Sequence, residues 1–117
     1  MKNKRKVGNN YERIAGEYLE RQGYQIIEYN FYSRAGEIDI VAKHGEYLVF
    51  VEVKYREYDR KGHPFEAVSF LKRRTISQCA FYYLQKNHLQ NVSVRFDVVG
   101  ILGEDIEVIQ NAFEFTM

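Results

Sequence analysis

The stretch 36–56, read GEIDIVAKHGEYLVFVEVKYR, most constrains what this chain can fold into. It holds two strand-like runs around a turn at 44–45, and each run places charged residues among apolar ones. Alternate side chains of a strand point to opposite faces, so Glu52 and Lys54 share one face of the second run. A hairpin loop with an even number of residues brings Asp39 to that face, whereas a three-residue loop separates them.

Two carboxylates and an amine on one patch of a hydrophobic sheet are costly unless a cation lies between the carboxylates. Asp39, Glu52 and the main-chain carbonyl of Val53 offer the hard oxygen ligands that Mg²⁺ prefers. Lys54 points the same way and could orient an attacking water or stabilise negative charge near a phosphate. The alternative is a structural ion pair of Glu52 with Lys54 or Arg56, worth about 0–1 kcal/mol on an exposed face. Spacing alone does not separate the two interpretations.

Composition indicates one globular domain. The chain has 117 residues, of which 45% are hydrophobic and 15% aromatic, enough to form a real core. No stretch approaches the roughly 20 apolar residues of a membrane span, and the basic segment 1–8 has no apolar region behind it. Cys79 has no second cysteine to pair with, and the three histidines lack zinc-ligand spacing. We therefore expect a cytoplasmic protein without a signal peptide, with 1–8 as a mobile basic tail.

The charges are unevenly distributed along the chain although the net charge is only +1. The segment 54–74 contains seven basic and three acidic residues, whereas the segment beyond Lys86 contains one arginine and five acidic residues. This asymmetry suits a protein that turns one face towards phosphates. Ordinary solvated surface is the alternative, and charge alone favours it.

Periodicity and turn signals predict two helices and five strands. We expect a helix from Asn9 or Asn10 to Gly23, strands at 24–31, 37–43 and 47–55, a loop at 56–63, a helix from Pro64, and strands at 92–102 and 106–109. This order predicts an α/β fold with a central mixed sheet of about five strands flanked by the two helices.

The apolar stripes of the helices leave two questions open. Glu12 lies at the edge of the first stripe, where it could reach the interior or merely complement the positive end of the helix, worth about 0.3–1 kcal/mol. The second stripe is predicted to contain Val68, Leu71, Thr75, Cys79 and Tyr82. Its segment 79–84 is apolar nearly all round, which predicts either a buried end or a contact with a second subunit.

The chain resembles a known family along nearly its whole length. The matching pieces are Gly8-x-x-x-Glu12 with Ala15 and Tyr18-Leu19, Gly23-Tyr24, Asn30, Gly36-Glu37-Ile38-Asp39, Phe50-Val51-Glu52-Val53-Lys54-x-Arg56, Gly62-x-Pro64-x-Glu66-Ala67-Val68, Lys72, and Arg95-Phe96-Asp97. In this ordered series the chain is similar to the YraN-type family of small bacterial endonuclease-like proteins. That family resembles the PD-(D/E)xK nuclease superfamily, which includes restriction endonucleases and archaeal Holliday-junction resolvases.

The resemblance implies a single restriction-endonuclease-like domain over 1–117 and a role for individual residues. Asp39 and Glu52 match the superfamily's metal-binding acids, Lys54 matches its lysine, and Glu12 matches a first-helix glutamate that helps complete the metal site. The expected metal ligands are thus these three acids with the Val53 carbonyl. The motif's proline is replaced by isoleucine at 38.

Basic residues near these acids are the expected contacts to DNA. They are Arg56, Lys72, Arg34 and Lys61, with the loop 56–63 beside the substrate path. Such contacts position a backbone without reading its sequence. Glu37 is left open between three roles, which are binding metal, pairing with Arg56, or beginning the strand.

The resemblance therefore implies a Mg²⁺- or Mn²⁺-dependent nuclease that hydrolyses phosphodiester bonds in DNA, with branched or otherwise structured DNA among its substrates. The first alternative is a nucleic-acid-binding or adaptor protein that keeps the fold without cleaving. The second is a structural dimer module that uses 79–84. Resolving a junction needs two active sites, so a homodimer is expected in that case, and no membrane contact is expected.

Overall fold

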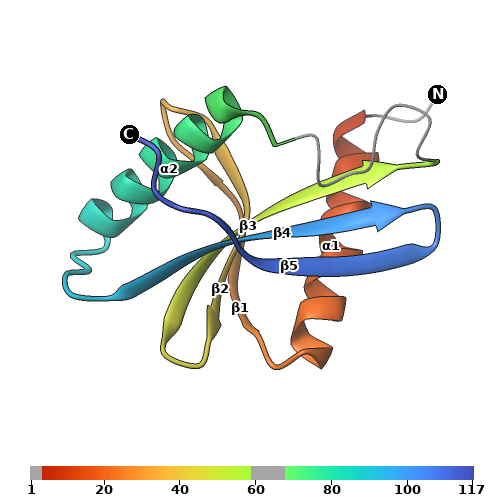
Figure 1. Cartoon of the computed structure of the whole chain (residues 1–117), viewed down its shortest axis with the longest axis horizontal. Coiled ribbons are helices and arrows are strands. Elements are labelled where there is room, and N and C mark those ends of the chain that lie inside the picture. The colour runs from red at the N-terminus through yellow and green to blue at the C-terminus, as the bar shows by residue number, and fades with distance from the viewer. Residues whose placement is uncertain (1–3, 59–67) are drawn as a thin grey trace.

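The computed structural model describes residues 4–58 and 68–117. The elements are α1 (Lys4–Arg21), β1 (Gln25–Tyr32), β2 (Glu37–His44), β3 (Tyr47–Arg56), α2 (Phe70–Lys86), β4 (Ser93–Leu102) and β5 (Asp105–Phe113) (Figure 1). The five strands form one sheet in the order β1-β2-β3-β4-β5, in which only β3 and β4 are parallel. The predicted α/β fold with a mixed sheet and two helices is confirmed.

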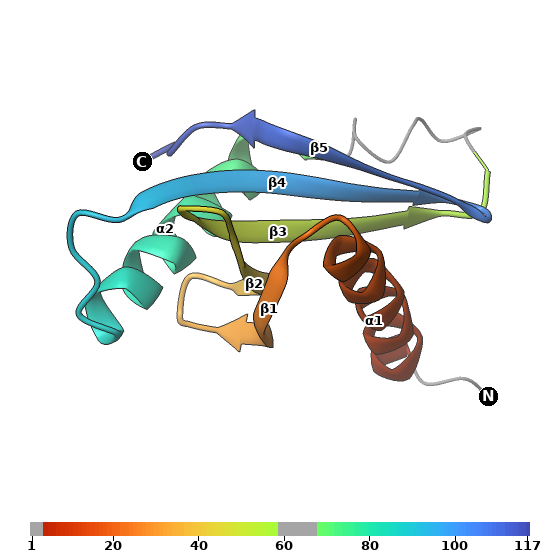
Figure 2. The ribbon, with the colours of Figure 1, turned by 90° about the horizontal axis from the view of Figure 1, so that it is seen from below.

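The central strand β3 is buried on both faces. Leu48 and Phe50 pack in a cluster with residues of α2, whereas Val49 and Val51 pack in a second cluster with residues of α1. Figures 1 and 2 show the two helices towards opposite ends of the sheet. The apolar run of β3 suits this double burial, because no side chain of its middle faces water. Within the described ranges, no helix is long and apolar enough to cross a membrane.

The turn between β2 and β3 settles the predicted geometry of the hairpin. His44 pairs with Tyr47, so the loop consists of Gly45 and Glu46, one residue later than expected. Gly45 has φ of 60°, a conformation that glycine adopts without steric cost. The loop has an even number of residues, and the register therefore directs Asp39 to the face of β3 that carries Glu52, as predicted for an even loop.

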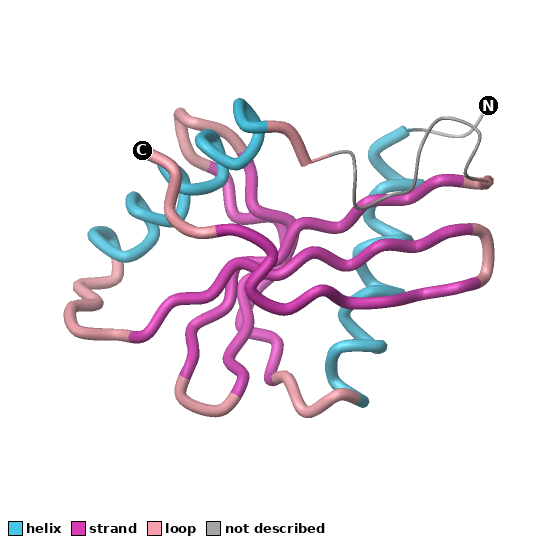
Figure 3. Tube along the Cα trace, viewed as in Figure 1, coloured by secondary structure: helices cyan, strands magenta, loops and turns pink. Residues whose placement is uncertain are grey.

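The strands twist strongly, and the first residues of β2 separate from β3. Figure 3 shows the five strands converging in the middle of the molecule and fanning out on both sides. The paired register of β2 with β3 runs as far as Ile40 opposite Val51. Beyond this pair, the Val53 N–H donates to Oδ2 of Asp39 at 2.7 Å. An acidic side chain thus satisfies a backbone donor at the point where the strands part.

Both helices begin at other residues than predicted. α1 starts at Lys4, inside the predicted tail, because lysine and arginine are good helix formers and continue the helix past Asn9 and Asn10. α2 starts at Phe70, with Ser69 as N-cap accepting a hydrogen bond from the Lys72 N–H at 3.2 Å. The predicted start at Pro64 lies outside the described residues.

The buried face of α2 is also rotated from the predicted stripe. Cys79 is buried as expected, but Leu71 and Tyr82 are exposed at 71% and 49%. The buried positions are Ile76, Ser77, Cys79, Ala80 and Tyr83. Periodicity could not select this face, because the segment 79–84 is apolar on all sides. The edge strand β5 is longer than the predicted 106–109, because it continues past a register shift to the buried Phe113, which pairs with Phe96 of β4.

A buried polar network explains the two charged residues of β4. Asp97 is fully buried and accepts hydrogen bonds from Arg95 Nε and Nη2 (2.9 and 2.8 Å), Tyr24 Oη (2.6 Å) and the Asn111 N–H (2.9 Å). Arg95 Nη2 also lies 2.8 Å from His44 Nδ1. These bonds satisfy the carboxylate, so Asp97 joins β4 to its neighbours and takes no part in the site below.

Candidate metal centre

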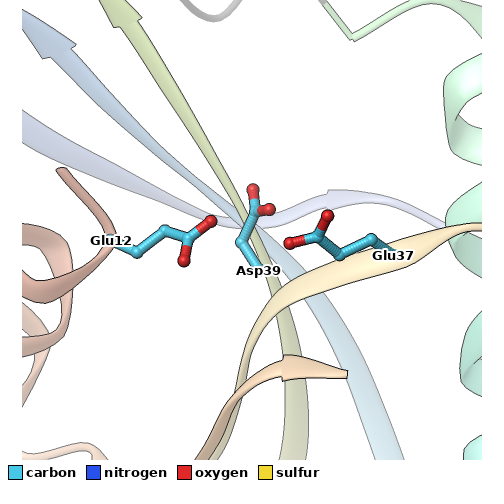
Figure 4. A group of neighbouring side chains, drawn as sticks. All are labelled: Glu12, Glu37 and Asp39. Carbon is cyan, nitrogen blue, oxygen red and sulfur yellow. The ribbon is translucent and has the colours of Figure 1, made fainter. Parts of the chain in front are cut away.

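Three carboxylates meet between α1 and the start of β2. Glu12, Glu37 and Asp39 each offer an oxygen atom, and these atoms lie within 4.8 Å of one another. Figure 4 shows Asp39 between the other two, with the carboxylates turned towards one another. Glu37 and Asp39 are two residues apart on one strand and therefore share a face. The structure thus unites two acids predicted from the sequence with Glu37, whose role the sequence left open.

Glu52 lies beside these three acids and joins them to two lysines. Its side chain is 4% exposed, and its Oε1 is 3.3 Å from Lys54 Nζ and 3.7 Å from Lys72 Nζ. The negative charge of Glu52 raises the pKa of both Asp39 and Glu12, which shows that the four acids form one electrostatic unit. We call Glu12, Glu37, Asp39 and Glu52 the carboxylate cluster.

Burial and mutual repulsion act on the carboxylate cluster. Desolvation raises the pKa of Asp39 well above its usual range, the charge of Glu52 adds to this, and the Val53 N–H opposes it. Desolvation also raises the pKa of Glu12, partly offset by a hydrogen bond with Asn30. Glu12 and Asp39 share a side-chain hydrogen bond, which requires a proton on one of the two carboxyl groups. Both groups would ionise readily if a cation replaced that proton.

Two oxygen atoms of the carboxylate cluster are buried without a hydrogen-bond partner in the part of the chain that the structure describes. They are Oε2 of Glu12 and Oε2 of Glu52. A buried acceptor without a partner costs roughly 1–3 kcal/mol, and more when it is charged. Hard carboxylate oxygens are the ligands that Mg²⁺ and Mn²⁺ prefer. The donor set of Glu12, Glu37 and Asp39 therefore fits a divalent cation, whereas the predicted ligand Glu52 lies outside this group of three.

The basic residues predicted to contact DNA are dispersed. Lys72 reaches the carboxylate cluster from α2 through Glu52. Arg56 is half-buried, and its Nη1 donates to the main-chain carbonyl of Tyr55 at 2.9 Å. Arg34 is exposed in the connection before β2, and Lys61 lies outside the described residues.

Two further residues of the site carried weak signals in the sequence. Glu37 could have been found from its spacing, because a Glu-x-Asp pair places both acids on one strand face. Asn30 is held with φ of 56°, a left-handed conformation that asparagine tolerates better than most residues. Its hydrogen bond with Glu12 depends on the packing of α1 against β1, which no local pattern encodes.

The fold and site define an α/β protein with acidic residues gathered between its first helix and its mixed sheet. The chain belongs to the uncharacterised protein family UPF0102, whose model matches residues 11–101. This span includes all four acids of the carboxylate cluster, and the match confirms the YraN-type family that the sequence resembles.

Proteins similar to this chain occur in several bacteria. A UPF0102 protein of Lachnoclostridium phytofermentans is 50% identical over 113 residues, which cover 96% of each chain. A UPF0102 protein of Vibrio campbellii is 46% identical over 93% of each chain. One of Caldicellulosiruptor saccharolyticus is 42% identical over 95% of this chain and 99% of its own. The names of these proteins state no activity.

Proposed function

We propose that this protein is a Mg²⁺- or Mn²⁺-dependent nuclease that hydrolyses phosphodiester bonds in DNA, including branched or structured DNA. The observation that carries the proposal is the carboxylate cluster, in which two buried oxygens lack a hydrogen-bond partner among the described residues while two lysines lie alongside. Carboxylates and ammonium groups side by side are what phosphodiester hydrolysis requires for binding a cation and handling negative charge.

The acids of the proposed site are positioned before any ligand arrives. Glu12, Glu37 and Asp39 would hold the cation, and Glu52 with the Val53 carbonyl would complete its ligands. The Val53 N–H fixes the Asp39 carboxylate, so little side-chain freedom is lost on binding. Once bound, Mg²⁺ or Mn²⁺ supplies neutralisation of phosphate charge and a lowered pKa for an attacking water.

The two lysines have different proposed tasks. Lys54 follows Glu52 on the same face of β3, and its side chain is 24% exposed, so its ammonium can orient water or stabilise charge on the phosphate. Lys72 comes from α2, is 38% exposed, and would contact the DNA backbone. Arg56, Arg34 and Lys61 are proposed as further backbone contacts.

One observation favours the alternative of a binding or adaptor protein that does not cleave. Oε1 of Glu52 already lies beside two lysines, so this acid is neutralised without a metal ion. A protein that used the carboxylate cluster only as a structural ion-pair network would bind DNA through its basic residues and leave it intact.

The deciding experiment compares cleavage of linear, flapped and four-way DNA in Mg²⁺ or Mn²⁺. We expect Glu52→Gln and Lys54→Ala to lower the rate at least about 100-fold, as removal of a group that stabilises transition-state charge does. Glu37→Gln should weaken Mn²⁺ binding about tenfold if its carboxylate is a ligand. Glu28→Gln, at an exposed acid of β1, is the matched control and should be neutral.

Two outcomes would contradict the nuclease proposal. Cleavage that survives both Glu52→Gln and Lys54→Ala would place the reaction elsewhere. Wild-type protein that binds branched DNA but never cuts it with either metal would establish the binding alternative.

The proposal extends to a homodimer acting in the cytoplasm. Of the segment 79–84, Cys79, Ala80 and Tyr83 are in the core, whereas Phe81 and Tyr82 are 46% and 49% exposed. These two aromatic side chains could contact a second subunit, as paired cuts in a junction would require. Sedimentation of wild type and Phe81→Ser tests the dimer, and a monomeric wild type would remove this part of the proposal.

A further inference from the structure

An open depression of about 650 Å³ lies between α1 and the end of β3. Its lining residues are Tyr11, Tyr55, Arg56, Glu57 and Tyr58. Tyr11 directly precedes Glu12 on α1, and Tyr55 directly follows Lys54 on β3. The lining thus includes the chain neighbours of two proposed site residues, on two different elements.

Aromatic rings and one planar cation form the walls of this depression. The rings of Tyr11 and Tyr55 are in edge-on contact, with centroids 3.9 Å apart and an interplanar angle of 74°. Their side chains also share a hydrogen bond, which holds the two rings together. Arg56 is tied by its Nη1 to the Tyr55 carbonyl at 2.9 Å. Tyr58 is 48% exposed at the rim.

This chemistry suits a nucleobase at the tyrosine rings, next to the backbone contact proposed for Arg56. Tyrosine rings and a guanidinium plane both stack on bases, and such stacking tolerates any sequence because every base has a π-face. The carboxylate of Glu57 would repel a phosphate, whereas it can accept a hydrogen bond from a base N–H. A base inside a duplex has both faces covered by its neighbours, so only an unpaired base can enter.

We propose that the depression formed by Tyr11, Tyr55, Arg56 and Tyr58 binds one unpaired nucleobase in the vicinity of the carboxylate cluster. This inference rests on the proposed action on DNA and narrows it. The preferred substrate carries an unpaired nucleotide next to the phosphate that is cut, as in a single strand, a flap or a frayed branch point.

The test measures binding without cleavage. Fluorescence anisotropy in EDTA compares a labelled thymidine oligonucleotide with one of equal length in which abasic sites replace the bases. Both carry the same phosphates, so the ratio of their dissociation constants isolates the bases. We expect the wild type to prefer the thymidine oligonucleotide about tenfold, a typical effect of stacking one base.

Substitutions locate the preference in the depression. Tyr58→Leu and Tyr55→Leu should each reduce the preference several-fold, whereas Tyr55→Phe keeps the ring and should retain it. Tyr47→Leu is the matched control, because Tyr47 is 38% exposed and lines a separate depression near Arg95. Thermal unfolding of each variant checks that the fold is intact.

Equal affinity of the wild type for the two oligonucleotides would overturn this inference, as would a preference that survives Tyr55→Leu combined with Tyr58→Leu. A protein that never cuts DNA but shows the base preference would support the base site while refuting the nuclease. A protein that cuts without the preference would refute the base site alone.

Discussion

Opposing effects act on the ionisation of Asp39, and a bound cation would favour its carboxylate form. Desolvation and the negative charge of Glu52 favour its protonated form, while the Val53 N–H at 2.7 Å favours its carboxylate. A residue kept in this state contributes little to stability, which is typical of groups retained for binding or catalysis.

Asp39→Asn should therefore stabilise the metal-free protein and abolish its response to metal. The amide oxygen can still accept from the Val53 N–H, while a charge of the cluster is removed. We expect about 1–2 kcal/mol of added stability near neutral pH, in the range found when buried charges are neutralised. Urea unfolding measures this gain, and thermal unfolding in Mn²⁺ should show a rise for the wild type only. A variant that is less stable, or that still responds to Mn²⁺, would contradict the assignment of Asp39 as a ligand.

The raised pKa values of Asp39 and Glu12 also predict a pH dependence. Above their ordinary pKa values of 3.8 and 4.5, the folded state binds more protons than the unfolded state. The contribution of these two groups to the free energy of unfolding without metal should thus be largest below about pH 4. It should fall as the pH rises through their pKa values in the folded state.

A metal ion bound as proposed would compete with these protons, so the stabilisation by Mn²⁺ should grow with pH over the same window. Thermal unfolding at about pH 5 and about pH 8, with and without Mn²⁺, measures it. Asp39→Asn serves as the control, since it should flatten the dependence. Stabilisation by Mn²⁺ that is independent of pH would mean that the metal binds elsewhere.

At the scale of elements, α1 must pack closely on β1 for Glu12 to reach the carboxylate cluster. Gly16 is buried at this contact, and a Cβ atom there would overlap the hydroxyl and ring of Tyr29. The guanidinium of Arg13 lies 4.3 Å from the centre of the same ring and holds it in place. The absence of a side chain at Gly16 thus sets the distance between the helix and the sheet.

Gly16→Ala should destabilise the protein although alanine is the better helix former. Propensity alone would add about 1 kcal/mol of stability. Overlap with Tyr29 should outweigh this and give a net loss of about 1–3 kcal/mol, as overpacking commonly does. Chemical denaturation measures the loss, and Tyr29→Ala in the same background should relieve part of it. A more stable Gly16→Ala protein would show that α1 is loosely packed and that Glu12 is not held by this contact.

The sequence predicted the individual strands better than it predicted how strands and helices are arranged relative to one another. Alternation of apolar and charged residues predicted the hairpin and the shared face of Glu52 and Lys54, because these depend on the local period of a strand. It left open whether Asp39 joins them, since that depends on whether the loop has an even number of residues. The predicted start of α1 was wrong. Its polar composition had indicated a tail at 1–8, but residues 4–8 have enough helix propensity to extend the helix.

At the scale of the molecule, the carboxylate cluster forms where β2 parts from β3. α1 carries Glu12 to this place from one end of the sheet, and α2 carries Lys72 to it from the other (Figure 1). The meeting depends on the twist of the whole sheet, which a single sequence does not reveal. Residue spacing therefore could not show that Glu37 and Glu12 meet, although family resemblance had indicated Glu12.

The same arrangement predicts how DNA binding depends on salt. Under the proposed function, lysines bordering the acids would neutralise phosphates and release counterions, so the logarithm of the binding constant should fall linearly with the logarithm of salt concentration. Lys72→Ala removes one proposed phosphate contact and should make that slope shallower by about 0.9 for duplex DNA. Lys43→Ala is the control, because this exposed lysine lies at the turn end of β2. Anisotropy titrations over a range of salt concentrations measure both, and equal slopes for wild type and Lys72→Ala would exclude Lys72 from the DNA path.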